Sequence, residues 1–426
     1  MHKIERLLHT LAPKGVEFKT LEEIFEIRNG YTPSKNNPEF WKNGTIPWFR
    51  MEDIRENGRI LKDSIQHITP KALKGKKLFP KNSIIISTTA TIGEHALLIV
   101  DSLANQRFTF LSKKANCDLA LDMKFFFYQC FLLGEWCKNN TNVSGFASVD
   151  MSAFKKYKFP IPPLEIQQEI VKILDAFTEL NTELNTELNA RKKQYKYYQN
   201  MLLDFNDINQ NHKDAKEKLA QKTYPKRLKT LLHTLAPKGV EFRKLGEVCE
   251  IIRGKRVTKK EILDKGKYPV VSGGIGFMGY LNEYNREENT ITIAQYGTAG
   301  FVNWQNQKFW ANDVCFSLIP NETLIINRYL YYVLTNMQNY LYSISNRSAI
   351  PYSISSNNIM QITIPIPPLE IQQEIVKILD QFSILTTDLL AGIPAEIKAR
   401  KKQYEYYREK LLTFKPLTPL NSKELA

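Results

Sequence analysis

Apolar residues recur every three to four positions along two long stretches of the chain. The first stretch runs from Leu164 to about Leu203, and the second runs from Leu369 to about Leu412. In the first stretch the apolar stripe consists of Ile166, Ile170, Ile173, Leu174 and Phe177. This spacing is typical of an amphipathic α-helix, and about 40 helical residues span roughly 60 Å. Because a single stripe on so long a helix needs a partner, we predict that the two helices form an antiparallel coiled coil.

The two predicted helices start alike and differ in the middle. Each starts after a proline pair, Pro162-Pro163 or Pro367-Pro368, where proline is tolerated. The first helix then carries the tetrapeptide TELN three times, at 178–189, whereas the second has Gly392-Ile393-Pro394. Each TELN unit adds about 6 Å of helix and about 40° of rotation. The glycine and proline of the second copy predict a break or bend.

The regions between these helices have a different pattern. Short β-like runs bounded by turn residues occur at Ser83–Thr89, Thr290–Gln295 and Val314–Ile319. The segments 122–137 and 327–342 have a helical pattern instead. We therefore predict two similar α+β domains separated by the pair of long antiparallel helices.

The chain also repeats itself almost letter for letter. LLHTLAPKGVEF occurs at Leu7–Phe18 and Leu231–Phe242, and PIPPLEIQQEIVKILD occurs at Pro160–Asp175 and Pro365–Asp380. Weaker matches, such as Gly30 with Gly254 and Asn105 with Asn312, keep the register between these blocks. Such duplication indicates two structural units of one kind.

These repeats divide the chain into five segments. They are an N-terminal constant segment (1–18), a first variable domain (19–159), a central constant helix with a linker (160–242), a second variable domain (243–364) and a C-terminal constant helical region (365–426). The first long helix is followed by a copy of the LLHTLAPKGVEF block, whereas the second is not, and the other copy lies at the N-terminus. We therefore expect a circular, pseudo-twofold arrangement with neighbouring termini. The polar stretch 206–222 is expected to be a flexible linker.

The net charge of +15 and the isoelectric point near 9.3 indicate a polyanionic partner such as nucleic acid or a membrane surface. A generally basic proteome is the alternative explanation. The N-terminus lacks the apolar core of a secretory signal, and no apolar run approaches the roughly 18 residues of a membrane span. The five cysteines lack metal-site spacing. We therefore expect a cytoplasmic protein with reduced cysteines that is not inserted in a membrane.

Motifs of common catalytic and cofactor sites are absent from the sequence. It has no GxxxxGK[ST] phosphate loop, no Asn/Asp-Pro-Pro-aromatic tetrapeptide and no GxGxxG turn leading into a helix. The six histidines show no metal-ligand spacing, and His9 and His233 are interpreted as capping or packing residues of the duplicated block. We therefore predict no catalytic site, no metal and no cofactor in this chain.

The duplicated block PPLEIQQEIVKILD, followed each time by ARKKQYxYY, resembles the conserved regions of the specificity (S) subunits of type I restriction–modification systems. The TELN units stand where that family carries a tetrapeptide repeat. Short segments resemble hallmarks of its target-recognition domains: Ile46-Pro47-Trp48, Ile92-Gly93, Tyr268-Pro269, Ser272-Gly273-Gly274 and Thr298-Ala299-Gly300. The resemblance covers nearly the whole chain.

This resemblance implies a non-catalytic DNA-binding subunit in which each domain reads one half of an interrupted double-stranded site. It also implies docking of two methyltransferase (M) subunits, which use S-adenosylmethionine, and of ATP-dependent restriction/translocase (R) subunits. The paired helices would act as a ruler and docking surface. The alternatives are a coiled-coil protein-interaction scaffold that does not bind DNA, a nuclease or methyltransferase with an unrecognised site, and a specificity subunit of a fused restriction–methylation enzyme.

Reading of base edges requires polar side chains on loops that reach a groove. Candidates in the first domain are Arg50, Arg55, Thr88, Thr89 and Arg107; those in the second are Arg253, Arg256, Gln295, Tyr296, Arg347 and Asn358. Phosphate contact and plain solvation are the commoner roles of such residues. The basic runs 191–193 and 400–402 either grip acidic groups or form a solvated helix face. We interpret Ile166, Ile170, Ile371 and Ile375 as coiled-coil core rather than partner interface.

Overall fold

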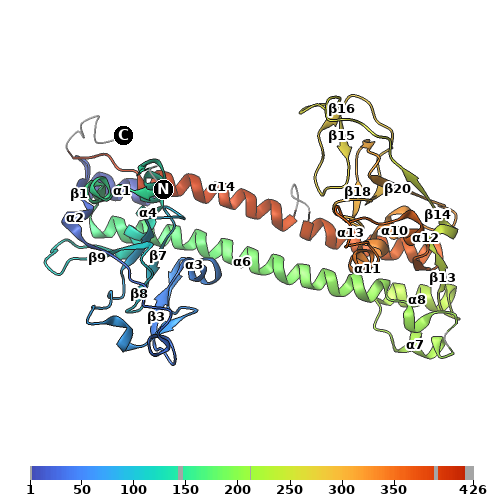
Figure 1. Ribbon diagram of the computed structural model, residues 1–426, viewed down its shortest axis with the longest axis horizontal. Helices are drawn as coiled ribbons and strands as arrows, with labels where there is room; N and C mark the ends of the chain where they lie inside the picture. Colours follow the sequence, from blue (N-terminus) through green and yellow to red (C-terminus); the bar gives the residue numbers. More distant parts are fainter. Residues whose placement is uncertain (1, 143–146, 212, 388–391, 418–426) are drawn as a thin grey trace. The chain divides into compact units, whose positions relative to one another are not determined.

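The computed structural model describes residues 2–142, 147–211, 213–387 and 392–417 (Figure 1). The chain forms two compact units. Unit 1 comprises Met1–Glu183 together with Ile397–Ala426, and unit 2 comprises Leu184–Glu396. Each unit contains helices and β-sheets packed around buried apolar residues of its own, so the predicted α+β class is confirmed.

The longest element is α6, Leu164–Leu203, whose 40 residues match the first predicted helix. Its first turn is closed by the carbonyl of Pro163, which accepts hydrogen bonds from the N–H groups of Ile166 (2.9 Å) and Gln167 (3.2 Å). Residues of α6 up to Glu183 belong to unit 1, and those from Leu184 belong to unit 2. The helix is therefore continuous from one unit into the other.

The second predicted helix is present as α13 (Leu369–Thr387) and α14 (Gly392–Leu412). Gly392 has φ of +78°, a conformation that glycine adopts readily. A Cβ atom at this position would lie 2.6 Å from the carbonyl oxygen of Ile384. Pro394 follows within the first turn, where a missing N–H costs no helical hydrogen bond. The described residues agree with the predicted break, and residues 388–391 lie outside them.

Each unit contains one pair of helices that run in opposite directions (Figure 1). In unit 1, the ring of Phe177 on α6 lies 6.2 Å from that of Tyr404 and 5.6 Å from that of Tyr407 on α14. In unit 2, Tyr198 on α6 stacks on Phe382 of α13 at 5.0 Å. The antiparallel pairing predicted from the apolar stripes is confirmed.

Unit 1 contains a five-stranded and a three-stranded sheet. The larger has the order β2 (Phe25–Asn29), β9 (Phe108–Lys113), β6 (Ile84–Ser87), β7 (His95–Leu98) and β4 (Ile60–Leu61). The smaller has the order β5 (His67–Ile68), β3 (Ile46–Phe49) and β8 (Leu103–Ala104). Helix α4 (Met123–Asn139) packs on β6 and β7. Because β3 pairs in parallel with β8, the loops that follow these two strands meet at one edge.

Unit 2 repeats this plan with fewer strands. Its larger sheet has the order β14 (Cys249–Arg253), β20 (Cys315–Pro320), β17 (Thr290–Ala294) and β18 (Val302–Gln305). Its smaller sheet has the order β16 (Tyr280–Leu281), β15 (Tyr268–Val271) and β19 (Trp310–Ala311), with β15 parallel to β19. The predicted helix over 327–342 is divided at Met337 into α10 (Asn327–Asn336) and α11 (Gln338–Ser343).

Two glycines hold corresponding close contacts in the two domains. A Cβ atom on Gly30 would lie 2.2 Å from the carbonyl oxygen of Asn105, and one on Gly254 would lie 2.1 Å from that of Asn312. No other residue type fits so close to a carbonyl oxygen. The two variable regions therefore share one fold through a few fixed positions and not through extensive sequence identity.

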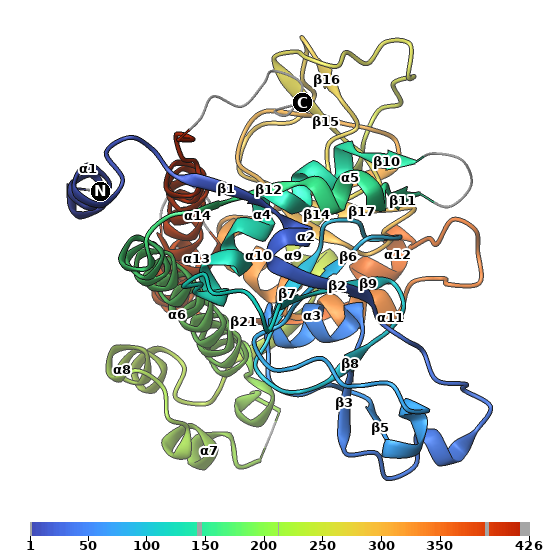
Figure 2. The same cartoon turned by 90° about the vertical axis from the view of Figure 1, so that its left-hand side faces the viewer.

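The N-terminal block closes unit 1 as its copy closes unit 2. Strand β1 (Glu17–Thr20) lies beside β12 (Lys158–Ile161) (Figure 2). Strand β13 (Glu241–Lys244) likewise pairs with β21 (Thr363–Ile366). The N–H of Val16 donates to the carbonyl of Lys415 at 2.8 Å, and the N–H of Val240 donates to that of Ile208 at 2.7 Å. The first contact joins the two ends of the described chain, and the second is made within continuous sequence. The circular arrangement is confirmed.

The remaining elements are short. In unit 1 they are α1 (His2–Leu11), α2 (Leu21–Ile24), η1 (Pro38–Phe40), α3 (Met51–Asn57), η2 (Pro70–Leu73), β10 (Thr141–Asn142), β11 (Ser148–Val149) and α5 (Met151–Lys156). In unit 2 they are η3 (Asn206–Ile208), α7 (Ala215–Gln221), α8 (Lys226–Leu235), α9 (Leu245–Val248) and α12 (Ser356–Met360). His9 and His233 are exposed in the last turns of α1 and α8. All five cysteines are free, and four of them are buried.

The expectation of a flexible linker at 206–222 is wrong for its described residues. They form η3 and α7, and the side chains of Ile208 and Leu219 are buried in the core of unit 2. Lys222 forms ion pairs with Asp204 (3.6 Å) and Asp207 (3.4 Å). The polar composition concealed these few apolar anchors, which suffice to order a short segment.

The duplicated PIPPLEIQQEIVKILD block attaches each domain to its helix through a fully buried glutamine, Gln167 or Gln372. The amide of Gln167 donates to a carbonyl before the helix and to one in the domain, and its oxygen accepts a domain N–H. The partners are Pro162 O (2.7 Å), Ala120 O (3.1 Å) and Asp122 N (2.8 Å). Gln372 repeats all three bonds with Pro367 O (2.8 Å), Leu324 O (3.0 Å) and Ile326 N (2.8 Å).

About two turns further along each helix, an aspartate makes a second attachment. Asp175 accepts a hydrogen bond from the hydroxyl of Tyr128 (2.6 Å) and forms an ion pair with Lys124 (2.6 Å). Asp380 accepts a hydrogen bond from the hydroxyl of Tyr332 and forms an ion pair with Arg328 (2.9 Å). The four isoleucines predicted to be coiled-coil core, Ile166, Ile170, Ile371 and Ile375, are fully buried. They lie in cores shared with the α+β domains, so each helix start is part of its domain.

Replacing Gln167 by Ala should destabilise unit 1 by about 2–4 kcal/mol, because two buried carbonyls and one N–H lose their partner. Urea denaturation would measure the loss, and hydrogen exchange should place the faster exchange in unit 1. Gln168, the exposed neighbour on the same helix, supplies the matched control Gln168→Ala, which should leave stability within about 0.5 kcal/mol. Equal effects of the two substitutions would contradict the anchoring role.

His95 on β7 is another of the buried polar residues of unit 1. Its ring lies 5.4 Å from that of Phe127 and 4.5 Å from that of Phe131 on α4. Burial, followed by the positive charges of Arg59 and Arg408, lowers its pKa from 6.5 to about 3. The folded protein therefore holds this imidazole neutral under conditions in which the unfolded chain protonates it.

This shift predicts an acid-dependent loss of stability. The contribution of His95 is complete above pH 6.5 and declines as the pH falls toward the folded-state pKa of about 3. Lowering the pH from 6.5 to 5 should reduce the contribution of His95 to the free energy of unfolding by about 2 kcal/mol. Urea denaturation at each pH should show a shallower dependence in His95→Leu than in the unaltered chain. His9→Gln, which alters an exposed histidine, should keep the original slope. An unchanged slope in His95→Leu would exclude this histidine as the cause.

Candidate DNA interface

A cavity of about 270 Å³ opens in unit 1 where the loops after β3 and β8 meet. Its lining includes Arg50 and Arg107 from the predicted set, together with Thr32, Lys35, Trp48 and Gln106. The three cationic side chains come from three different loops. The cavity therefore gathers positive charge and hydrogen-bond donors at one place on the domain.

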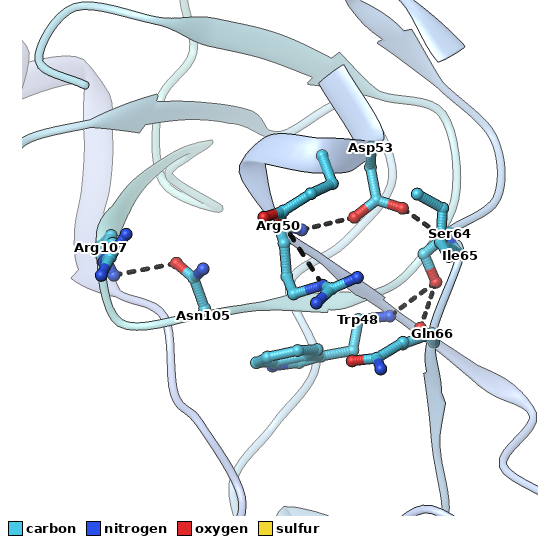
Figure 3. Close-up of polar contacts among 9 residues, drawn as sticks. Trp48, Arg50, Asp53, Ser64, Ile65, Gln66, Asn105 and Arg107 are labelled. Carbon is cyan, nitrogen blue, oxygen red and sulfur yellow. Dashed lines mark hydrogen bonds and ion pairs between the residues drawn. The ribbon is translucent and has the colours of Figure 1, made fainter. Parts of the chain in front are cut away.

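Arg50 is held by its backbone and by the ring beneath it (Figure 3). Its N–H donates to the carboxylate of the fully buried Asp53 at 2.6 Å, and the other oxygen of that carboxylate accepts the N–H of Ile65 at 2.6 Å. The guanidinium lies 5.9 Å from the ring centre of Trp48 and 3.8 Å from the carboxylate of Glu52. Its Nε is enclosed without a hydrogen-bond partner, while 25 % of the side chain is exposed.

Arg107 enters the cavity from the turn after β8. Its N–H donates to the side-chain oxygen of Asn105 at 3.0 Å (Figure 3). Its side chain is exposed. Nearby, the hydroxyl of Thr32 donates to the side chain of Gln106. Arg107 thus has a fixed backbone and a solvated head group, which suits contact with an anion outside the protein.

The other candidates of the first domain have different surroundings. Arg55 is exposed on α3 and lines a neighbouring cavity of about 610 Å³. Thr89 is half-buried and pairs with Ser148 of the β10–β11 hairpin. Thr88 is only 5 % exposed, and its hydroxyl shares a hydrogen bond with that of Thr109 at 3.0 Å. Because this hydroxyl is enclosed, we withdraw Thr88 from the candidates for base contact.

The arginine-lined cavity has no counterpart of the same chemistry in the second domain. The N–H of Asn105 donates to the carbonyl of Phe49, and the N–H of Asn312 donates to that of Val271. By this register the residue that follows β15 at the place of Arg50 is Ser272. The N–H of Thr88 donates to the carbonyl of Arg107, and the N–H of Gln295 donates to the carbonyl of Val314. Val314 therefore stands at the place of Arg107. The described second domain therefore offers a hydroxyl and an isopropyl group where the first offers two guanidinium groups.

Several candidates of the second domain lie around a hairpin at 346–353. Tyr296 pairs with Ser353, which also pairs with Asn346. The guanidinium of Arg347 lies 5.4 Å from the ring centre of Tyr342 and 5.5 Å from that of Tyr352. The structure thus brings Tyr296 and Arg347 onto the same part of the domain.

The remaining four candidates join this group to different degrees. Gln295 precedes Tyr296 and is half-buried, and its side-chain oxygen has no partner. Arg253 donates from Nε to the carbonyl of Asp313 at 2.6 Å, next to the loop that Gln295 contacts. Arg256 is exposed on the loop after β14. Asn358 lies on α12, where its side chain donates to the carbonyl of Ile344 at 3.3 Å, and this bond ties it to the fold.

Sequence reasoning missed Thr32, Lys35 and Gln106. Gln106 stands between Asn105 and Arg107 in the turn that it shares with them, and Thr32 and Lys35 follow the constrained Gly30. Proximity to a fixed glycine or asparagine is the signal that could have identified them. The basic run 191–193 is exposed on α6, where Arg191 pairs with Glu187 at 3.4 Å. In the run 400–402, Arg400 is half-buried and the two lysines are exposed.

Within the described ranges, no three His, Cys, Asp or Glu side chains are placed to hold a metal ion together. Over the same residues, no helix combines the length and apolar character needed to cross a membrane.

Comparison with known proteins identifies the family. The model of the type I restriction modification DNA specificity domain matches the chain twice, over residues 13–194 and 237–399. The chain belongs to the type I restriction–modification specificity family. The two matches coincide with the two copies of the duplicated pattern, and DNA binding follows from membership of this family.

Relatives of this specificity subunit match over most of its length. It is 41% identical over 392 residues to the type I restriction enzyme EcoprrI specificity subunit of Escherichia coli, covering 88% of this chain and 89% of that one. It is 31% identical over 317 residues to the EcoR124I/EcoR124II specificity subunit of the same species, covering 66% and 71%.

Solved structures of such subunits share the fold. The S subunit from M. genitalium superposes with a TM-score of 0.57 at 18% identity, covering 96% of this chain and 97% of that one. A chain from a study of complex assembly and conformational transition in a type I R-M system gives a TM-score of 0.54 at 18% identity, covering 93% and 96%. Both comparisons support the α+β plan with two domains.

Proposed function

We propose that this specificity subunit reads a bipartite double-stranded DNA site, one half with each α+β domain, and docks two methyltransferase (M) subunits and restriction/translocase (R) subunits. The observation that carries the proposal is the repetition of identical anchors. Gln167 and Gln372 make the same three hydrogen bonds, and Asp175 and Asp380 make the same attachments, to domains of different sequence. Constant helices that carry variable domains in one fixed manner suit two readers of two different half-sites.

The net charge of +15 supports an electrostatic contribution to DNA binding that is independent of sequence. The arginine-lined cavity of the first domain and the Tyr296–Arg347 group of the second are the proposed contact surfaces. M-subunit docking is proposed for the exposed faces of the helix pairs, where Tyr197 on α6 is 59 % exposed and Tyr406 on α14 is 60 % exposed. The names of the E. coli relatives, which are specificity subunits of restriction enzymes, support this assembly.

Deleting one TELN unit tests the two-reader proposal. The deletion shortens α6 by about 6 Å and rotates the rest of the helix by about 40°, so the spacer should shorten by about one or two base pairs of 3.4 Å each. The altered and unaltered chains would each be co-expressed with the cognate M subunit, and methylated sites would be mapped genome-wide by single-molecule sequencing. Both half-sites should remain unchanged. A methylation motif with altered half-sites would refute the ruler.

If the mapping reveals no methylation motif at all, further measurements distinguish the alternative functions. If the purified chain with its M subunit also showed no salt-dependent DNA affinity, the protein-interaction scaffold would be favoured. If the chain alone methylated or cleaved DNA, it would be an enzyme. A partner that carries both restriction and methylation activities in one chain would indicate the fused-enzyme variant.

The two arginines of the cavity should differ in effect. Arg50 has a positioned planar head group suited to the edge of a guanine, and its replacement by Ala should relax one base pair of the first half-site by about 1–3 kcal/mol. Arg50→Lys should not restore selectivity, because lysine lacks the two-pronged geometry. The exposed Arg107 suits a phosphate, so Arg107→Ala should weaken all sequences alike and reduce the salt slope by about 1. Fluorescence anisotropy with cognate and singly substituted duplexes at several salt concentrations would measure both effects. Uniform weakening by Arg50→Ala would assign it to phosphate as well.

A further inference from the structure

The tip of the 346–353 hairpin presents an apolar side chain almost completely to solvent. Ile350 is 98 % exposed and is followed by Pro351 and by Tyr352, which is 45 % exposed. Scattered exposed apolar residues are common on protein surfaces, so exposure alone assigns no role. The position, rigidity and charged surroundings of this tip are the features that distinguish it.

The hairpin is held in shape by its own hydrogen bonds. The N–H of Asn346 donates to the carbonyl of Ser353 at 2.7 Å, and the N–H of Ser353 donates back at 3.1 Å. The side-chain oxygen of Asn346 accepts the N–H groups of Ser348 (3.0 Å) and Ala349 (3.3 Å). Ile350 is therefore carried on a constrained turn, and ordering it against a ligand costs less entropy than ordering a free loop.

The base of the hairpin is cationic and adjoins the proposed DNA contacts. Arg347 lies between the rings of Tyr342 and Tyr352 and donates from Nε to the carbonyl of Tyr342 at 3.3 Å. Tyr296, two residues after the end of β17, pairs with the hairpin at Ser353. A guanidinium beside the tip suits the DNA backbone, while the side chains of Ile350 and Pro351 have no polar group to offer a phosphate.

A neighbouring loop adds to the apolar surface on this part of the domain. Ile275 is 69 % exposed on the loop between β15 and β16. The same loop carries Gly273, whose carbonyl accepts the N–H of Thr298, and the N–H of the adjacent Gly297 donates to the carbonyl of Tyr352. Apolar side chains thus protrude from two neighbouring loops of the second domain.

We propose that Ile350 is an apolar wedge that enters a groove of the DNA and partly unstacks one base step in the second half-site. The proposal rests on the proposed function, since it assigns a further specificity-determining residue to the second reader. Isoleucine and proline are among the side chains that proteins insert between base pairs, with basic residues alongside to hold the phosphates. The energy needed to unstack a step depends on its sequence, so the wedge selects deformable steps without hydrogen bonds to base edges.

The test uses the full chain with its M subunits and a duplex that carries the mapped site. 2-Aminopurine is placed in turn at each adenine or guanine position of the second half-site, and fluorescence is read at saturating protein. One position should brighten with the unaltered chain, lose that signal with Ile350→Ser and regain it with Ile350→Met, which restores apolar bulk. Affinity should fall about 10- to 100-fold in Ile350→Ser, and the salt slope should stay unchanged because no charge is removed.

The matched control is Ile319→Ser. Ile319 is 41 % exposed on β20 of the same domain. It lies four residues, or about 13 Å, along this strand from Cys315, which is the end of the strand nearer to the hairpin. The Ile319→Ser substitution should alter neither the 2-aminopurine fluorescence nor the affinity for DNA. Unchanged affinity in Ile350→Ser, or weaker binding with no 2-aminopurine signal that depends on Ile350, would overturn the wedge. If the unaltered chain showed no sequence-specific DNA binding, the proposed function would be overturned instead.

Discussion

A buried amide at the start of each long helix is the interaction on which the rest of the structure depends. Gln167 and Gln372 satisfy two carbonyls and one N–H that would otherwise be buried without partners. A missing partner for a buried polar group costs more than an ordinary hydrogen bond contributes, so the sequence at the helix start is tightly restricted. Two of the three partners are carbonyls, which every residue type supplies. The same helix block can therefore hold domains of unlike sequence.

This arrangement separates the constant and variable requirements of a specificity subunit. Gly30 and Gly254 make corresponding close contacts within the two domains. The glutamine and aspartate anchors attach each domain to its helix. The loops outside these positions differ in sequence between the two domains. The first domain has a cavity lined by Arg50 and Arg107 where the loops after β3 and β8 meet, and the second has a protruding apolar tip at Ile350 on the 346–353 hairpin. Domains of one fold thus carry different chemistry on their loops.

The sequence by itself determined the repeat, the long helices and the family. Identity between two 16-residue blocks and an apolar spacing of three to four residues depend only on local order along the chain. The α+β class followed in the same way from short runs bounded by turn residues. These features could be predicted because helix periodicity and duplication need no knowledge of long-range contacts.

Only the tertiary structure decided which candidate side chains are accessible and which of them lie together. Thr88 and Thr89 are neighbours in sequence, yet Thr88 is enclosed against Thr109 while Thr89 is half-buried beside the hairpin. Gln106 joins the arginines because β3 pairs in parallel with β8, and Thr32 and Lys35 join them because the N–H of Tyr31 donates to the carbonyl of Ala104 on β8. Likewise, the polar linker is ordered by a few apolar contacts with unit 2. Burial and the meeting of loops arise from contacts between distant residues, and local sequence patterns carry little information about them.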